Sequence, residues 1–239
     1  MNRLVFDSMN KKELFSYLES NKQRKVLNFL NQHDLFQRER VNRFHSALNK
    51  KNNLNFIDGF TISAFLSLKN LKRIPRIRGP TFTRDFLSIP SFSEEKVHFF
   101  IGLNKEDLII LRKKLPFLKK TYSYNPSFIV QSSFPRKEIK KIAQLINKSN
   151  SDFVWVCVGS PKQNILSQDL FSLTDNQYYF NVGAALDFIL GKKKEAPLFF
   201  REIGIEWLYR LITDFKYSKK KVWRSFVGLK YLNKVELKH

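Results

Sequence analysis

The stretch "SDFVWVCVGSPKQNILSQDLF", residues 151–171, holds the clearest strand of the chain and the helix that follows it. Residues 152–160 are almost entirely apolar up to a Gly-Ser pair, which is typical of a strand covered on both faces. Pro161 suits the first turn of a helix, because a backbone N–H at that position would have no intrahelical partner. A buried strand leading directly into a helix is a unit of a parallel α/β sheet.

Short β-type runs alternate with helical segments on both sides of this unit. Strands are predicted at 25–31, 54–59, 96–103 and 178–182, with a short strand or turn at 121–128. Helices are predicted at 35–50, 60–68, 105–115 and 135–149. The alternation predicts an α/β fold whose mostly parallel sheet is sandwiched by helices.

In such a fold, ligands bind beyond the carboxyl ends of the strands. Several polar and glycine positions follow directly after predicted strands and would meet at that edge. They are Asn31, Asp58, Gly102, the turn Gly159–Gln163 with Ser160, and the turn Gly183–Asp187.

The composition changes near Pro197. Residues 198–215 are strongly amphipathic, and residues 216–238 mix Lys and Arg with Trp223, Phe226 and Tyr231. We therefore divide the chain into a core, residues 1–195, and a basic, aromatic appendage, residues 196–239. Basic and aromatic side chains together suit an anionic membrane surface, although a solvated basic face is the plainer alternative.

The charge balance narrows the classes of partner. Lys and Arg number 43 against 21 acids, a formal charge of +22, which favours nucleic acid, an anionic membrane or a phosphorylated substrate as the partner.

The start of the chain lacks the apolar core of a signal peptide, and no window reaches the roughly 20 apolar residues of a spanning helix, so we expect a soluble or peripheral protein. The four His are scattered, and a metal site is not expected.

Each motif has a plain alternative. Asp58–Gly59 is either a strand-end turn or a carboxylate held as a general base. "VGSPKQN" is either a helix cap at Ser160 or a helix N-terminus that seats phosphate. Arg76 and Arg78 of "PRIRG" are either a solvated pair or a diphosphate clamp. Glu206 and Arg210 stand four residues apart, as in a surface ion pair.

Together, "IDG", "PRIRG", "VGSPKQN", "NVGAALDFILGKKKEAP" and "GIEWLYRL" resemble the WecG/TagA/CpsF glycosyltransferases, family 26, in family order across residues 25–224. The resemblance implies a Rossmann-like core and a C-terminal appendage that closes over the active site. It also implies an inverting enzyme that moves a sugar from a UDP-sugar (UDP-N-acetylmannosamine-like, UDP-hexose or UDP-uronic acid) to a polyprenyl-diphosphate-linked sugar. Such enzymes work at the cytoplasmic face of the membrane in cell-surface polysaccharide or wall polymer synthesis.

The resemblance also implies residue roles. Asp58 falls on the proposed catalytic base, and Arg76, Gln163 and Asp187 fall on positions associated with the nucleotide sugar. Appendage arginines would reach the diphosphate: Arg201, Arg210 and Arg224. Two positions depart from the family pattern: Phe29 stands in a Thr position, and Asn164 stands where Glu is common after "SPKQ".

Inverting transfer needs one carboxylate, which takes the proton from the acceptor hydroxyl. The departure of UDP also requires that the negative charge developing on its phosphate be neutralised. The chain has no Asp-x-Asp motif and many arginines, so we expect Arg side chains and backbone N–H groups to do this without a metal or other cofactor. The alternatives are a nucleic-acid-binding protein, which no recognisable motif supports, and an inactive family member acting as a scaffold. Homo-oligomerisation stays open.

Overall fold

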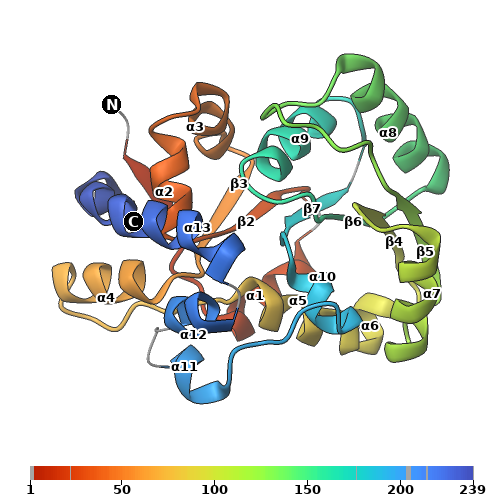
Figure 1. Ribbon diagram of the computed structural model, residues 1–239. Coiled ribbons are helices and arrows are strands. Elements are labelled where there is room, and N and C mark those ends of the chain that lie inside the picture. The colour runs from red at the N-terminus through yellow and green to blue at the C-terminus, as the bar shows by residue number, and fades with distance from the viewer. Residues whose placement is uncertain (1–2, 22, 176, 203–205, 214, 239) are drawn as a thin grey trace.

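Six parallel strands form the central sheet of the computed structural model, in the order β3-β2-β7-β6-β4-β5 (Figure 1). Their bounds are β2 Val26–Leu30, β3 Asn53–Ile57, β4 Val97–Ile101, β5 Lys120–Tyr124, β6 Phe153–Val156 and β7 Tyr178–Asn181. The structure describes residues 3–21, 23–175, 177–202, 206–213 and 215–238, without the side chains of residues 202, 207, 210 and 215–218. Every pairing within the sheet is parallel, as the sequence predicts.

Helices cover both faces of this sheet (Figure 1). Those of the core are α1 Lys11–Ser20, α2 Gln32–Arg38, α3 Asn42–Leu48, α4 Phe60–Lys69, α5 Gly79–Ser88, α6 Pro90–Ser93, α7 Lys105–Lys114, α8 Arg136–Ser149, α9 Lys162–Phe171 and α10 Ala185–Leu190. Those of the appendage are α11 Leu198–Glu202, α12 Glu206–Thr213, α13 Phe215–Gly228 and the 3-10 helix Leu229–Lys234. The chain therefore has a Rossmann-like α/β architecture followed by a mainly helical C-terminal segment.

Strand β6 shows how the apolar runs are used. Phe153 and Trp155 enter the core on the side of α1, α5 and α6, whereas Val154 and Val156 pack on the side of α8 and α9. Successive side chains of a strand point to opposite faces, so a continuous apolar run is what a doubly covered strand requires. This arrangement places the polar residues of the strand ends at one edge of the sheet.

The region predicted as one helix at 35–50 forms two shorter helices, α2 and α3. Val41 is extended between them, with φ −123° and ψ 97°. Leu35 of α2 and Phe44 of α3 nevertheless belong to the same buried cluster. Because both helices bury their apolar side chains in one cluster, the spacing of those residues did not reveal the break.

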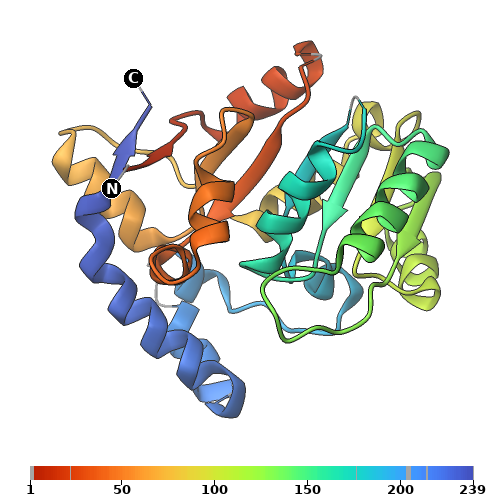
Figure 2. The same ribbon diagram turned by 90° about the horizontal axis from the view of Figure 1, so that it is seen from above.

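The appendage returns to the beginning of the chain. Strand β8, Val235–Leu237, pairs in parallel with β1, Leu4–Phe6, in a separate two-stranded sheet. Helix α13 packs along α2, and a Cβ atom added to Gly228 would lie 1.9 Å from the carbonyl oxygen of Gln32. Figure 2 shows the appendage beside the carboxyl edge of the strands. No described helix is long and apolar enough to cross a bilayer.

Candidate active site

Asp58 follows β3 directly and is fixed through its backbone. Its N–H donates to the carbonyl oxygen of Leu30 over 2.8 Å, which continues the pairing of β3 with β2. Its Oδ1 lies 3.3 Å from the backbone N–H of Gly79, and its carbonyl oxygen accepts from Nε of Arg76. The side chain is partly buried between the end of the sheet and the segment at 76–79. Asp58 is therefore an oriented carboxylate rather than the tip of a loose turn.

The surroundings of Asp58 raise the pKa of its carboxyl above the ordinary value for aspartate. Burial raises the pKa of its carboxyl to about 6, against the opposing charge of Arg76. Glu206 adds to the rise, whereas Arg78 opposes it. A carboxyl with a pKa of about 6 is ionised at neutral pH yet more basic than an ordinary aspartate. Such a group is suited to accept a proton from a hydroxyl.

Arg76 and Arg78 bind the appendage. Nη1 of Arg76 donates to the carbonyl oxygen of Arg201 over 2.9 Å. Nη2 of Arg78 donates to Oε1 of Glu206 over 2.7 Å, and Nη2 of Arg76 lies 3.6 Å from the other oxygen of the same carboxylate. Both guanidinium groups are mostly buried, with 17% and 14% of the side chain exposed. The pair is thus an internal contact and not a solvated one.

A second group of predicted residues lies at the ends of β6 and β7. Gln163 is buried in the first turn of α9, and a Cβ added to Gly183 would lie 3.5 Å from its Oε1. Gly159 and Gly183 have φ of +79° and +56°, a region that favours glycine. The Oγ of Ser160 and the Oε1 of Gln163 are buried without a hydrogen-bond partner among the described residues. An unmatched buried polar atom costs about 1–3 kcal/mol, so both atoms are suited to a ligand.

Asp187 lies in the first turn of α10 with about a third of its side chain exposed. Its Oδ2 is 2.6 Å from Nζ of Lys193, and its carbonyl oxygen accepts from the N–H of the same lysine. The chain therefore turns back after α10 and brings Lys193 onto Asp187. Among the described cations of the basic run, only Lys193 pairs with Asp187 in this way, because Lys192 binds Asp107 of α7 over 2.6 Å.

Gly102 and Asn31 support the backbone of the same edge. Gly102 has φ +103°, and an added Cβ would lie 3.3 Å from the backbone of Cys157. Asn31 caps α2: its Oδ1 accepts from the N–H of His33 over 2.9 Å. Strand β2 separates β3 from β7, so Asp58 and the turn Gly183–Asp187 follow strands that are about 10 Å apart, two strand spacings. Only an extended ligand could touch both.

The structure places the two departures from the family pattern in the interior. Phe29 is buried, and its ring lies 5.8 Å from that of Phe56 and 4.8 Å from that of Phe82. Asn164 is also buried and donates to Oδ1 of Asn28 over 2.7 Å. Both residues contribute to packing beneath the edge.

The appendage arginines differ in position. Arg201 binds Glu195 over 2.8 Å, and its Nε is buried without a partner among the described atoms. Arg224 is exposed on α13, with its guanidinium carbon 5.9 Å from the ring centre of Phe36. It also lies close enough to lower the pKa of His33, which burial lowers most. The side chain of Arg210 lies outside the described part of the chain.

Glu206 is the residue whose role the sequence pattern did not reveal. Its spacing from Arg210 indicates a local ion pair, yet its described partners are Arg78 and Arg76, far away in the sequence. Glu195 has a similar position, because it binds Arg84 over 3.0 Å as well as Arg201. Glu195 lies in the block "NVGAALDFILGKKKEAP" and Glu206 in "GIEWLYRL", and only their place in these blocks could have drawn attention to them. Among the described residues, no group of three or more His, Cys, Asp or Glu is placed to hold a metal ion.

One comparison relates this chain to known proteins. The model of the Glycosyl transferase WecG/TagA/CpsF family matches residues 2–235, which covers the core, the carboxyl edge and nearly all of the appendage. The match includes every element that contributes to the candidate site. The chain therefore belongs to the WecG/TagA/CpsF family of glycosyltransferases, enzymes of cell-surface polysaccharide synthesis.

Proposed function

We propose that the protein transfers a sugar from a UDP-sugar to a polyprenyl-diphosphate-linked sugar with inversion, using Asp58 as the general base. The observation that carries this proposal is the position of Asp58: a partly buried carboxyl of raised pKa at the carboxyl edge, beside two arginines. Family membership supports the transfer of a sugar in general, whereas the donor, the acceptor and the residue roles are part of the proposal.

The proposed step is one displacement. The acceptor hydroxyl gives its proton to the carboxylate of Asp58 while its oxygen bonds to the anomeric carbon. The bond from that carbon to the phosphate oxygen breaks, and UDP leaves with the electron pair. Because the attack and the departure take place on opposite faces of the sugar ring, the configuration inverts.

We assign the nucleotide to the edge between Asp58 and Asp187. Gln163 and Ser160 offer buried oxygens that need a donor, and Asp187 offers a carboxylate that is partly exposed. Nη2 of Arg76 can donate a hydrogen bond to a phosphate oxygen, because its contact with Glu206 is loose at 3.6 Å. Arg201 is the second proposed diphosphate ligand, and Arg224 and Arg210 are further proposed ligands. This proposal uses fixed cations for the charge on the leaving UDP and assigns no metal or other cofactor.

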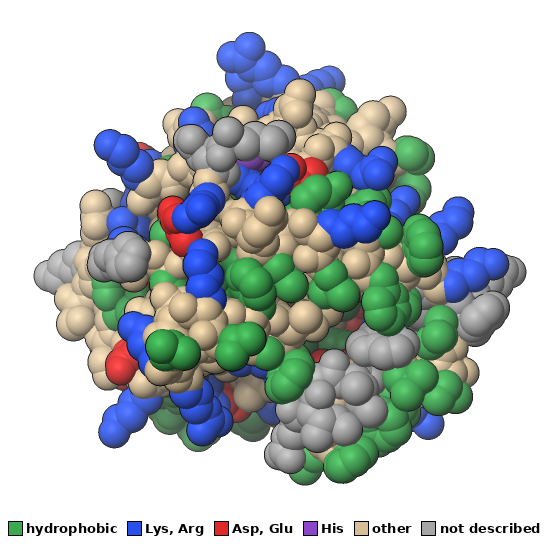
Figure 3. Space-filling model, turned by 90° about the vertical axis from the view of Figure 1, so that its left-hand side faces the viewer, with side chains coloured by type: hydrophobic (Ala, Val, Ile, Leu, Met, Phe, Trp, Pro, Cys, Tyr) green, Lys and Arg blue, Asp and Glu red, His purple; other side chains and the backbone are tan. Residues whose placement is uncertain are grey.

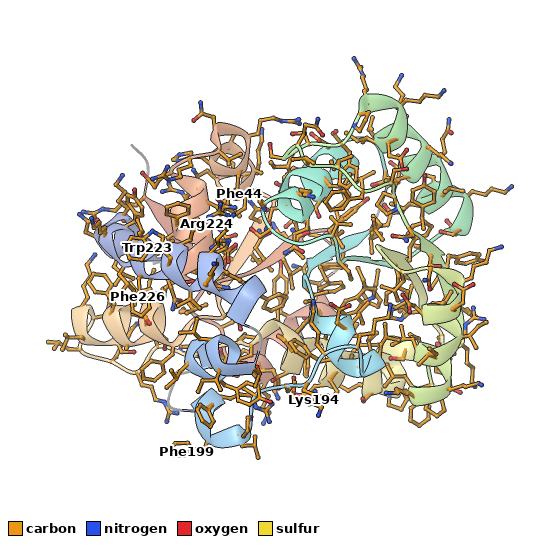
Figure 4. The ribbon with its side chains drawn as sticks, in the orientation of Figure 1. Phe44, Lys194, Phe199, Trp223, Arg224 and Phe226 are labelled. Carbon is orange, nitrogen blue, oxygen red and sulfur yellow. The ribbon has the colours of Figure 1, made fainter. Side chains whose placement is uncertain are left out.

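We also propose that the appendage holds the enzyme against the inner face of the cytoplasmic membrane, where a lipid-linked acceptor would lie. Phe199 of α11 and Trp223 of α13 expose 64% and 69% of their surface, and Phe226 exposes 46%. Figure 4 shows these side chains projecting from the two helices. In Figure 3, hydrophobic side chains gather on the face at the left of Figure 1, among Lys and Arg. Aromatic and basic groups together favour an anionic lipid surface.

A two-part experiment tests the proposal. Binding of UDP is measured by calorimetry for the wild-type protein and Asp58→Asn, and transfer is measured by release of UDP from a panel of UDP-sugars with polyprenyl-diphosphate acceptors. We expect similar UDP affinities and at least about a hundredfold lower turnover in the variant. Wild-type-like turnover by Asp58→Asn would exclude Asp58 as the base, and tight RNA or DNA binding in place of UDP binding would favour a nucleic-acid partner.

A further inference from the structure

Glu206 joins the appendage to the two arginines beside Asp58. It lies in the first turn of α12, and its two carboxylate oxygens are divided between Arg78 and Arg76, at 2.7 and 3.6 Å. About a quarter of its side chain is exposed, so water screens these contacts only in part. No other described acid forms a salt bridge with either arginine.

Arg76 is held from three sides. Its Nε donates to the carbonyl oxygen of Asp58, its Nη1 to the carbonyl oxygen of Arg201, and its Nη2 faces Glu206. Two of these three acceptors belong to the appendage. The orientation of Arg76 at the base therefore depends on the docking of α11 and α12.

Arg78 is held mainly by Glu206. Its Nη1 donates to Oγ1 of Thr81 over 3.1 Å, and its Nε is buried without a partner among the described atoms. Loss of the Glu206 carboxylate would leave a mostly buried guanidinium group with one side-chain acceptor. Such a group is expected to turn towards the remaining carboxylate of Asp58 or to draw in water, because an unpaired buried charge is costly.

The charges around Asp58 come from three parts of the chain. Arg76 and Arg78 come from the segment before α5, Asp34 comes from α2, and Glu206 comes from α12. Without Glu206, the two arginines would act on Asp58 with only Asp34 to offset them. The carboxylate form of Asp58 would then be favoured, and its pKa would fall.

We propose that Glu206 is a positioning residue whose carboxylate holds Arg76 and Arg78 in place beside Asp58 and offsets part of their positive charge there. Its effect on the reaction passes through those arginines. The inference rests on the proposed function where it concerns turnover, but the arrangement of charge is testable without turnover.

The test measures the titration of the Asp58 carboxyl by carbon-13 NMR, assigned by comparison with Asp58→Asn. In Glu206→Gln we expect the midpoint to fall by about half a unit or more. Glu236→Gln is the matched control: this appendage acid pairs over 3.4 Å with Arg3, in the β1–β8 sheet. We expect the control to leave the midpoint unchanged. An unchanged midpoint in Glu206→Gln, with a normal melting temperature, would overturn the proposal.

Glu206→Asp separates geometry from charge. The shorter side chain keeps the negative charge but cannot span the same distance to both arginines. We expect a midpoint close to that of the wild type and a kcat lower by about tenfold, with a smaller change in KM. Wild-type kcat in both Glu206 variants would also overturn the proposal. If the wild-type protein transferred no sugar, the proposed function would fail, while the NMR titration would still decide the role of Glu206.

Discussion

The indole N–H of Trp155 donates a 2.9 Å hydrogen bond to Nδ1 of His98 in the buried centre of the sheet. The other ring nitrogen, Nε2, lies 2.8 Å from the carbonyl oxygen of Phe92. An indole only donates and a carbonyl only accepts, so the two partners together select the neutral tautomer protonated at Nε2. Protonation of Nδ1 would break the bond to Trp155.

This pair predicts acid sensitivity. Burial lowers the pKa of His98 to about 4, below its ordinary value of 6.5, so the unfolded chain binds the proton more readily. The free energy of unfolding should therefore fall as pH drops from about 6.5 towards 4, by up to about 3 kcal/mol in all. Urea unfolding of the wild-type protein and His98→Gln checks this. Equal pH dependence in the two proteins would contradict it.

The profile of kcat/KM against pH should fall on its acidic side, and the pH at which it falls should be set by Asp58. With a pKa of about 6, the base is protonated and inactive below that pH and ionised above it. We expect kcat/KM to fall about tenfold per pH unit below this pH, measured at donor concentrations far below KM. A fall that begins near pH 4, the ordinary range of aspartate, would show that the environment of Asp58 does not act as described.

Gln163 should matter for nucleotide binding. Its buried Oε1 lacks a described partner, and UDP would provide one, so Gln163→Ala should weaken UDP binding by about 10- to 100-fold. Gln168→Ala is the control, because this residue of the same helix binds Asn53 over 2.6 Å. Calorimetry with UDP measures both. The same Kd for Gln163→Ala as for the wild-type protein would remove the residue from the site.

Membrane binding should depend on the exposed aromatics of α13. The double variant Trp223→Ala and Phe226→Ala should lower co-sedimentation with anionic vesicles by about tenfold. The reason is that each Å² of apolar surface buried in the membrane contributes about 25 cal/mol to the free energy of binding. Phe117→Ala is the matched control, since 44% of Phe117 is exposed, compared with 46% for Phe226. Equal loss in the two variants would argue against the appendage as the membrane contact.

Docking of α13 should depend on Gly228. An alanine Cβ would stand 1.9 Å from the Gln32 carbonyl oxygen, a backbone atom that cannot rotate away. We expect Gly228→Ala to destabilise the protein by about 1–3 kcal/mol and to lower turnover, because α13 must move away from α2. Lys220→Ala, at an exposed position of the same helix, is the control for melting temperature. A normal melting temperature for Gly228→Ala would contradict this prediction, because it would show that α13 and α2 accommodate the added methyl group at little cost.

The carboxyl edge could be predicted from the sequence because parallel strands all end there. Asp58, Gly159 and Asp187 each follow a predicted strand, and the structure brings all three to that edge. The same logic could not place Phe29, whose side chain points into the core from within its strand. Strand periodicity gives the face of a side chain only when the faces differ in polarity, and both faces of β2 are covered.

Contacts between the appendage and the core could not be predicted from local sequence patterns. Glu206 has a cation four residues away, and only the tertiary fold shows that its oxygens face Arg78 and Arg76. The strands β1 and β8 are three residues each, too short for a periodic signal. Their pairing depends on a register between residues at opposite ends of the sequence.

That pairing has a consequence for synthesis. Leu4 is synthesised before the Rossmann-like core, and its strand partner, Val235, is synthesised only after that core. A nascent chain can therefore assemble the central sheet while β1 is still without its neighbour. Closure of the two-stranded sheet is then a late event of maturation, and a chain stalled before residue 235 would leave the edge of β1 open to other strands.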